Sequence, residues 1–175
     1  QGACSSAVNA LQVDTLLDSI KADDSGITFV GYASGFERQG AADAEKLEEA
    51  VALAKKADTV LLCLGLDELR ESEGLDRSDM KLAENQQQLL AAVAAVNPNV
   101  VVLLSAGAPV ETPWAGQCRA LVYGALGGQA GAGAAADILT GKLCPCGKLS
   151  QTWAQAHDDT PAKANFGGEG RNVEY

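Results

Sequence analysis

Charged residues gather in one short loop of the sequence. Five acidic and two basic side chains lie between Asp67 and Arg77, shortly after the apolar run Thr59–Leu64 and its closing Gly65. A short apolar run of this kind is typical of a strand buried on both faces of a parallel sheet. Ligands of open α/β sheets bind just beyond the carboxyl ends of such strands. The sequence therefore places a group of carboxylates where this architecture puts its chemistry.

Three of these carboxylates are candidates for acid–base chemistry. On residue type alone, Glu71, Glu73 and Asp76 could transfer protons, with Arg77 holding one of them ionised. The alternative is a solvated acidic loop whose charges cap the next helix or pair with Arg70 and Arg77. The perturbed pKa that marks a catalytic carboxylate is a property of structure rather than of sequence. Residue types alone favour the solvated loop and leave both interpretations open.

A glycine-rich segment suggests a second kind of site. Residues 124–133 lie between a predicted strand and a predicted helix, as a dinucleotide-binding turn does. Gly128, Gly131 and Gly133 run in the opposite order to the G-x-G-x-x-G pattern, and they follow a late strand rather than the first. No phosphate-binding sequence ending in Lys and Ser or Thr is present. Close helix–sheet packing explains these glycines better, and a nucleotide-binding α/β module remains the alternative.

Neither a nucleophilic serine nor a metal site is predicted. Ser105 lacks a G-x-S-x-G motif, and the single histidine, His157, is far from it along the chain. Cys144 and Cys146 have no second half of a zinc motif elsewhere, and Cys63, inside the apolar run, is expected to be buried. Five cysteines, an odd number, favour a reducing compartment. We predict a bacterial cytoplasmic location, leaving secretion of a longer parent chain open, and no cofactor.

The composition indicates one globular domain over residues 1–175. The chain is 47% hydrophobic but only 5% aromatic, and it is long enough to bury a sizeable core. Its formal net charge of −10 argues against nucleic acid and against an anionic membrane surface, because both require clustered Lys and Arg. No apolar run reaches the roughly 18 residues that a membrane-spanning helix needs.

Helices and strands are predicted to alternate. Apolar periodicity predicts helices from Leu11 to about Asp23, over Asp43–Lys56, over Glu84–Val96, and after the glycine-rich turn to about Leu139. Short strands are predicted over Ile27–Val30, Thr59–Leu64, Val100–Leu104, Ala120–Tyr123 and Leu149–Trp153. Such alternation gives βαβ units. The predicted fold is therefore α/β, a three-layer sandwich with a mainly parallel sheet and helices on both faces.

Several motifs, taken in order, resemble one known family. The loop Glu71–Arg77, the pair Asn85-Gln86 and the turn Asn97-Pro98-Asn99 resemble the second domain of the family 3 glycoside hydrolases, the two-domain β-glucosidases and their relatives. Further segments fit the same domain: Gln1–Ser6, Gly107–Val110, Pro113-Trp114, Gly128–Gly131, Pro145–Trp153 and Asp159–Tyr175. The resemblance covers practically the whole chain, and agreement in order is more specific than any single motif.

The resemblance implies an α/β sandwich domain that packs beside a TIM-like barrel. In that family, retaining hydrolysis of terminal β-linked sugars uses a barrel aspartate as nucleophile and a sandwich-domain glutamate as acid/base. The two carboxyl groups of a retaining enzyme stand about 5–5.5 Å apart. The Glu-Gly-x-Asp-Arg signature implies that Glu73 is the acid/base, with Glu71 as the alternative. Asp76 and Arg77 would support the loop and the bound sugar.

Two parts of the family pattern are absent from the sequence. No stretch resembles the barrel or its Ser-Asp-Trp nucleophile segment, and the family's first strand would precede Gln1. The family usually continues past Tyr175, so we expect a domain truncated at both ends, inactive alone, with the barrel as partner and a carbohydrate as substrate. A missing strand leaves sheet edges unpaired, which predicts a homodimer or a substituted strand. A non-catalytic carbohydrate-binding domain is the remaining alternative.

Overall fold

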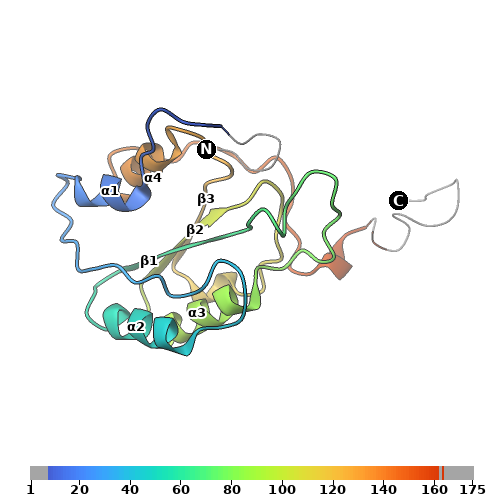
Figure 1. The fold of residues 1–175 in the computed structure, drawn as a ribbon, viewed down its shortest axis with the longest axis horizontal. Coiled ribbons are helices and arrows are strands. Elements are labelled where there is room, and N and C mark those ends of the chain that lie inside the picture. The colour runs from blue at the N-terminus through green and yellow to red at the C-terminus, as the bar shows by residue number, and fades with distance from the viewer. Residues whose placement is uncertain (1–7, 162, 164–175) are drawn as a thin grey trace, which may run out of the picture.

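The computed structural model describes residues 8–161 and 163, and it has three layers (Figure 1). The sheet consists of parallel strands in the order β1 (Val60–Gly65), β2 (Val100–Ser105) and β3 (Ala120–Tyr123). One layer of helices holds α1 (Leu16–Lys21) and α4 (Gly131–Leu139), and the other holds α2 (Ala44–Ala54) and α3 (Glu84–Ala94). Among the described residues, the 3-10 helix η2 (Ala115–Gln117) lies between β2 and β3, and η3 (His157–Asp159) follows α4. The predicted α/β sandwich with a parallel sheet and helices on both faces is confirmed.

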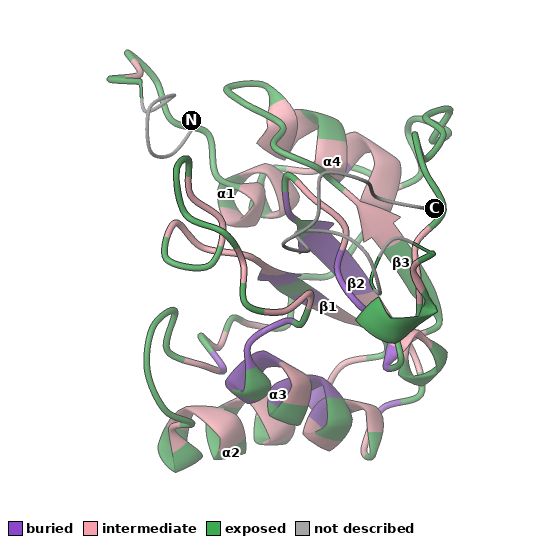
Figure 2. Ribbon diagram, turned by 90° about the vertical axis from the view of Figure 1, so that its right-hand side faces the viewer, coloured by how far each residue is buried: buried purple, intermediate pink, exposed green. Residues whose placement is uncertain are grey.

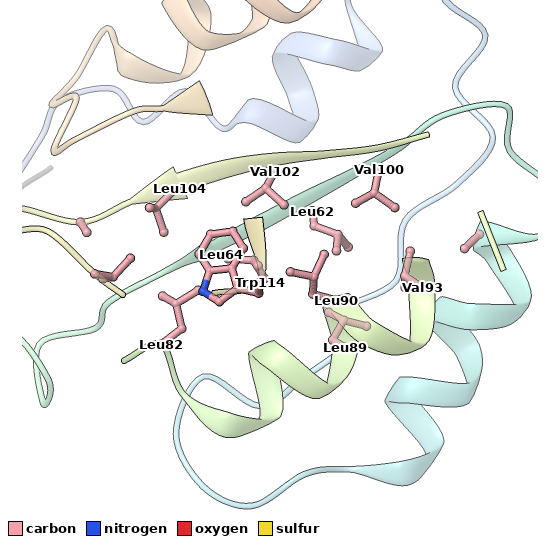
Figure 3. Close-up of a cluster of buried hydrophobic side chains, with 13 residues drawn as sticks. Leu62, Leu64, Leu82, Leu89, Leu90, Val93, Val100, Val102, Leu104 and Trp114 are labelled. Carbon is pink, nitrogen blue, oxygen red and sulfur yellow. The ribbon is translucent and has the colours of Figure 1, made fainter. Parts of the chain in front are cut away.

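The core lies between the sheet and the α2–α3 layer. β2 is the central strand, because it pairs with β1 and with β3. Successive side chains of a strand point to opposite faces, so alternate residues of β1 and β2 meet α3. Figure 3 shows these side chains closing around Trp114. The buried cluster includes Leu62, Leu64, Leu82, Leu89, Leu90, Val93, Val100, Val102, Leu104, Val110 and Trp114.

Side-chain caps set where the helices begin. Thr15 has extended backbone (ψ 150°), and its hydroxyl accepts a hydrogen bond from the Asp18 N–H at 3.1 Å. Helix α1 therefore begins at Leu16 rather than at Leu11, since a capping residue lies outside the helix. Asp43 caps α2 in the same way and accepts from the N–H of Glu45 at 3.0 Å. No helix within residues 8–161 is long and apolar enough to cross a membrane.

Three sequence-based expectations are wrong. Ile27–Val30 and Leu149–Trp153 are irregular rather than strands. A strand needs a neighbouring backbone to bond with, and neither segment pairs with β1, β2 or β3 in the described residues. Cys63 is exposed because its side of the sheet is poorly covered. The resembling segments Gln1–Ser6 and 164–175 lie outside the described residues.

Asn97 fixes how α2 and α3 lead into the sheet. Its side chain is buried, and Nδ2 donates to the carbonyl oxygens of Ala54 at 2.9 Å and Ala57 at 2.8 Å. Its Oδ1 accepts from the Asn99 N–H at 2.8 Å. The last carbonyls of a helix have no partner within the helix. Asn97 therefore satisfies the end of α2 and sets the start of β2, besides ending α3.

Candidate active site

We call residues 67–80 the acidic loop. Asp67 folds its start, directly after β1. Its Oδ1 accepts hydrogen bonds from the N–H groups of Leu69 and Arg70, both at 3.1 Å. The Glu71 N–H donates to the Asp67 carbonyl at 2.9 Å. Asp is favoured in such turns because its short side chain bonds the backbone two or three residues on. This turn sets the direction in which residues 71–77 leave the sheet.

Three hydrogen bonds fasten the acidic loop to the segment that follows β2. The pairs are Glu71 Oε2 with the Gly107 N–H at 2.7 Å, Arg77 Nη1 with the Pro109 carbonyl at 2.9 Å, and the Met80 carbonyl with the Glu111 N–H at 2.7 Å. The loop is thus held on both sides of residues 72–76. We call these contacts the three ties.

Glu73 lies at the exposed tip between the ties. Ser72 and Leu75 form an antiparallel bridge, and the Leu75 N–H donates to the Ser72 carbonyl at 3.3 Å. Gly74 completes this turn at φ +77°, a conformation that glycine adopts without steric cost. Glu73 is exposed, whereas Glu71 is half-buried. The loop therefore presents one glutamate outward and ties the other to backbone.

Asp76 and Arg77 lie on the same loop but line a pocket. Asp76 is exposed and Arg77 is half-buried. The pocket has a volume of about 400 Å³, and neither Glu71 nor Glu73 belongs to its lining. Of the four predicted residues, Asp76 and Arg77 therefore line the pocket, and the two glutamates do not.

The segment after β2 carries residues that hold the acidic loop and that the sequence did not reveal. A Cβ at Gly107 would lie 3.0 Å from Glu71 Oε1, so glycine permits the close approach of this carboxylate. Glu111 is 9% exposed, and its Oε1 accepts from the His157 N–H at 2.8 Å. This contact joins His157, near the C-terminal end of the described residues, to a residue that makes one of the three ties. The motif Gly107–Val110 was the available signal, but its contacts span more than 30 residues of sequence.

Gln86 holds the end of β1, at the base of the acidic loop. Its buried amide accepts from the Gly65 N–H and donates to the Gly65 carbonyl, both at 2.9 Å. This pair of bonds replaces a strand partner at that position. A Cβ at Gly65 would lie 2.1 Å from the Ser105 carbonyl oxygen, so glycine is required here.

The described residues show no cluster with metal-ligand character. No group of three His, Cys, Asp or Glu side chains in residues 8–161 is arranged to hold a metal ion. Cys144 and Cys146 are exposed free thiols. Helix α4 begins at Gly131 without a side-chain cap from Ala130.

Comparison with known proteins identifies the family. The glycosyl hydrolase family 3 C-terminal domain matches residues 1–175. Thermostable β-glucosidase B of Acetivibrio thermocellus is 38% identical over 176 residues, which covers 100% of this chain and 23% of that protein. An exo-α-(1→6)-L-arabinopyranosidase of Bifidobacterium breve is 39% identical over 177 residues, again 100% of this chain and 23% of the relative. The chain thus spans 23% of the length of these two relatives.

Solved structures agree with the sequence relatives. A family 3 β-glucosidase from Bifidobacterium adolescentis superposes with a TM-score of 0.88 and 42% identity, covering 97% of this chain and 25% of that chain. An exo-β-xylosidase in complex with a xylobiose aziridine probe gives a TM-score of 0.71 and 32% identity, over 80% of this chain and 18% of that one. The chain therefore belongs to glycosyl hydrolase family 3, in which it matches the C-terminal domain.

Proposed function

We propose that this chain acts within a retaining β-glycosidase and supplies Glu73 as the general acid/base. The proposed reaction is hydrolysis of a terminal, non-reducing β-linked sugar, with a β-glucosidase-like substrate. A catalytic barrel in a longer polypeptide would supply the nucleophilic carboxylate. The observation that carries the proposal is the position of Glu73, exposed at the tip of a loop that the three ties hold.

The geometry of the loop suits a general acid. Such a group must meet the glycosidic oxygen at hydrogen-bond distance and later remove a proton from water. Misplacement of a catalytic group by about 1 Å can cost ~100-fold in rate. The three ties restrict displacement of the loop tip that bears Glu73. A catalytic acid also needs a raised pKa, which comes from burial or from a nearby carboxylate. Docking of the barrel against the tip would provide both.

Glu71 is better suited to position the loop than to transfer a proton. Its carboxylate accepts the Gly107 N–H at 2.7 Å and packs where a Gly107 side chain would lie. This contact fixes the Glu71 carboxylate against the segment that follows β2. Asp76 and Arg77 are proposed to support the loop and the sugar, since Arg77 makes one of the three ties.

Leaving-group dependence tests the role of Glu73. In the longer enzyme, Glu73→Ala should lower kcat/KM by roughly 10²–10⁴ on a glycoside with a poor leaving group, because that step needs an acid. A substrate with a good leaving group should be affected far less, and azide should restore turnover as a glycosyl azide. Glu71→Ala is the matched control, and its loss should be similar for both substrates. Azide rescue of Glu71→Ala, with none for Glu73→Ala, would contradict the assignment.

The isolated chain should not turn over an aryl β-glucoside. Retaining hydrolysis needs two carboxyl groups on opposite sides of the scissile bond, and the proposed nucleophile lies on the barrel. Release of the aryl alcohol by the purified 175-residue chain, above the rate of a Glu73→Ala chain, would contradict this proposal.

Self-association is a further proposed property. Within the described residues β1 and β3 each pair only with β2, so apart from Gly65, whose backbone groups Gln86 bonds, both outer edges are without a neighbouring strand. Such edges recruit a further strand, and we propose that the isolated chain dimerises through one of them. A single monomeric species in sedimentation equilibrium at high concentration would contradict it.

A further inference from the structure

Two cysteines of the described chain stand two residues apart and have no part in the proposed reaction. Cys144 and Cys146 are both free and exposed, and a single proline separates them. Neither residue lines the pocket beside the acidic loop or takes part in the three ties. What this pair of thiols binds can therefore be examined apart from catalysis, and it does not depend on the function proposed above.

The residues just before Cys144 are anchored to the body of the domain. Lys142 Nζ lies 2.7 Å from the carboxylate of Asp23, in the turn after α1. The Leu143 N–H donates to the Asp137 carbonyl of α4 at 3.0 Å. These two contacts fix the direction in which the chain reaches the first thiol.

Pro145 restricts the backbone between the two thiols. Its ring fixes φ at about −65° and disfavours helical backbone at the residue before it, so few conformations of the tripeptide remain. Cys144 Sγ lies 3.8 Å from the Pro145 carbonyl oxygen. That carbonyl belongs to the peptide unit joined to Cys146, so the Cys144 thiol is turned along the chain toward the second thiol.

The spacing suits one ion held between two sulfur atoms. The Cα atoms of residues i and i+2 are at most about 7 Å apart. Metal–thiolate bonds are about 2.3 Å long, so an ion bound linearly by two thiolates separates the sulfurs by about 4.6 Å. Rotation about the Cα–Cβ bonds of Cys144 and Cys146 covers this separation, because both side chains are exposed.

The number and the kind of ligands select the ion. Among the residues that the structure describes, no group of three His, Cys, Asp or Glu side chains is arranged around a metal. Structural Zn²⁺ takes four ligands, and Mg²⁺ and Ca²⁺ prefer oxygen. Soft thiolates select Cu(I), for which two sulfurs in a line are sufficient. Lys148, exposed two residues after the second thiol, adds a positive charge near the anionic complex in the chain.

We propose that Cys144 and Cys146 bind one Cu(I) ion as a linear bis-thiolate. Both S–H bonds break and two Cu–S bonds form, so one Cu⁺ and two thiols give a complex of charge −1 and two released protons. No electron is transferred, because the copper enters and remains as Cu(I).

The test is a titration of the 175-residue chain with Cu(I), kept reduced by ascorbate under nitrogen, in competition with the coloured chelator bicinchoninate. One tightly bound copper per chain is expected. Cys144→Ser and Cys146→Ser should each weaken binding by roughly 100-fold, because a chelate then loses its second linked ligand. Cys118→Ser is the matched control, since this half-buried thiol donates to the Ala115 carbonyl at 3.1 Å, and its affinity for copper should equal that of the unsubstituted chain.

Alkylation identifies the binding thiols without any substitution. Iodoacetamide should modify Cys144 and Cys146 in the metal-free chain, because both are exposed. One equivalent of Cu(I) should protect these two thiols together, whereas Cys118 should react to the same extent with and without copper. Peptide mass spectrometry measures each thiol, and the same map in the longer enzyme does not depend on how well the isolated chain folds.

Three outcomes would overturn the proposal. The first is that the unsubstituted chain withdraws no copper from the chelator. The second is unchanged affinity when Cys144→Ser and Cys146→Ser are combined, or protection that falls on other cysteines. The third is a preference for Zn²⁺ with two chains per ion, which would make the pair one half of a four-thiolate site between two copies.

Discussion

The two faces of the sheet are covered to different degrees. Toward α2 and α3 the side chains of β1 and β2 are buried, and α3 itself buries five residues. Toward α1 and α4, Leu103 is buried, but Cys63 is exposed and Leu61 and Val101 are only half-buried. Helix α1 buries no residue and α4 buries only Ala136. Figure 2 shows the same contrast between α3 and the α1–α4 layer.

The contrast shows that apolar strands do not decide which face becomes the core. Residues 60–64 are apolar at every position, so the run looks the same from either side. The covered face has helices that immediately precede and follow β1 in the chain. The other face depends on α1 and α4, which come from opposite ends of the described chain. Stability should therefore be concentrated on the α2–α3 side.

Identical substitutions on the two faces should give the largest difference. Leu90 is fully buried on α3, and Leu90→Ala should lower the free energy of unfolding by about 2–5 kcal/mol through lost contacts and a residual cavity. Leu61→Ala, on the half-covered face, should cost about 1 kcal/mol. Urea denaturation of the isolated chain measures both. Equal losses would mean that the two faces contribute alike.

A clash in the sheet itself should weaken both faces together. In Gly65→Ala the new Cβ would lie 2.1 Å from the Ser105 carbonyl oxygen, so β1 and β2 must separate locally. Overpacking of this kind costs about 1–3 kcal/mol. Gly116→Ala is the control, because a Cβ there meets no atom within 4 Å. A Gly65→Ala chain as stable as the control in urea would disprove the close approach.

Loss of the Asn97 side chain should weaken the α2–α3 side alone. Asn97→Ala removes donors to two carbonyl oxygens, those of Ala54 and Ala57, and should cost about 1–3 kcal/mol. Asn97→Asp keeps the acceptor for the Asn99 N–H but replaces the donors with a buried carboxylate oxygen facing the two carbonyls, so it should cost at least as much. If hydrogen exchange at the end of α2 stayed unchanged in both variants, Asn97 would not secure that helix.

The smallest effect should come from the α1–α4 side and should depend on pH. Lys142 Nζ lies 2.7 Å from Asp23 and 3.0 Å from Asp24. The hydrogen bond from Lys142, followed by those from Ser25, lowers the pKa of Asp23 from 3.8 to about 2. The pKa of Asp24 is lowered for the same first reason. A lowered carboxyl pKa stabilises the fold above about pH 4, and this contribution is lost as the pH falls toward 2.

Lys142→Ala tests this ion pair. The variant should lose less stability than the unsubstituted chain between about pH 4 and pH 2, since its two carboxyls lose the largest cause of their lowered pKa values. Lys148→Ala, at an exposed position, is the control. Parallel stability curves for all three chains over this range would show that the pair adds nothing.

The apolar pattern of the sequence predicted the central strands β1 and β2, because these apolar runs also have buried residues in the structure. Val100–Leu104 is apolar, lies between two helices and finds neighbours on both sides. Ile27–Val30 carries the same local signal but remains exposed and irregular, because pairing depends on another segment's backbone. Local sequence therefore predicts which residues prefer extended structure, and the availability of partners decides which become strands.

The candidate site was predicted only in part for a similar reason. The order of charges located the loop that carries Glu73, since the loop follows an apolar strand. The contact of Glu71 with Gly107 spans 36 residues, and no periodicity encodes it. The pocket lined by Asp76 and Arg77 depends on three separate segments meeting. Residue type can suggest a proton donor, but contacts between distant segments determine how each carboxylate of the loop is held.

The three ties attach the acidic loop to the continuation of β2, although the loop follows β1 in the chain. β2 is hydrogen-bonded along both edges, so its end is anchored more firmly than that of an edge strand. When a protein surface contacts Glu73, the three ties would hold the loop in place against β2, so the loop would not rotate about Gly65. Docking on this tip therefore carries little entropic penalty, because the loop is ordered before its partner arrives.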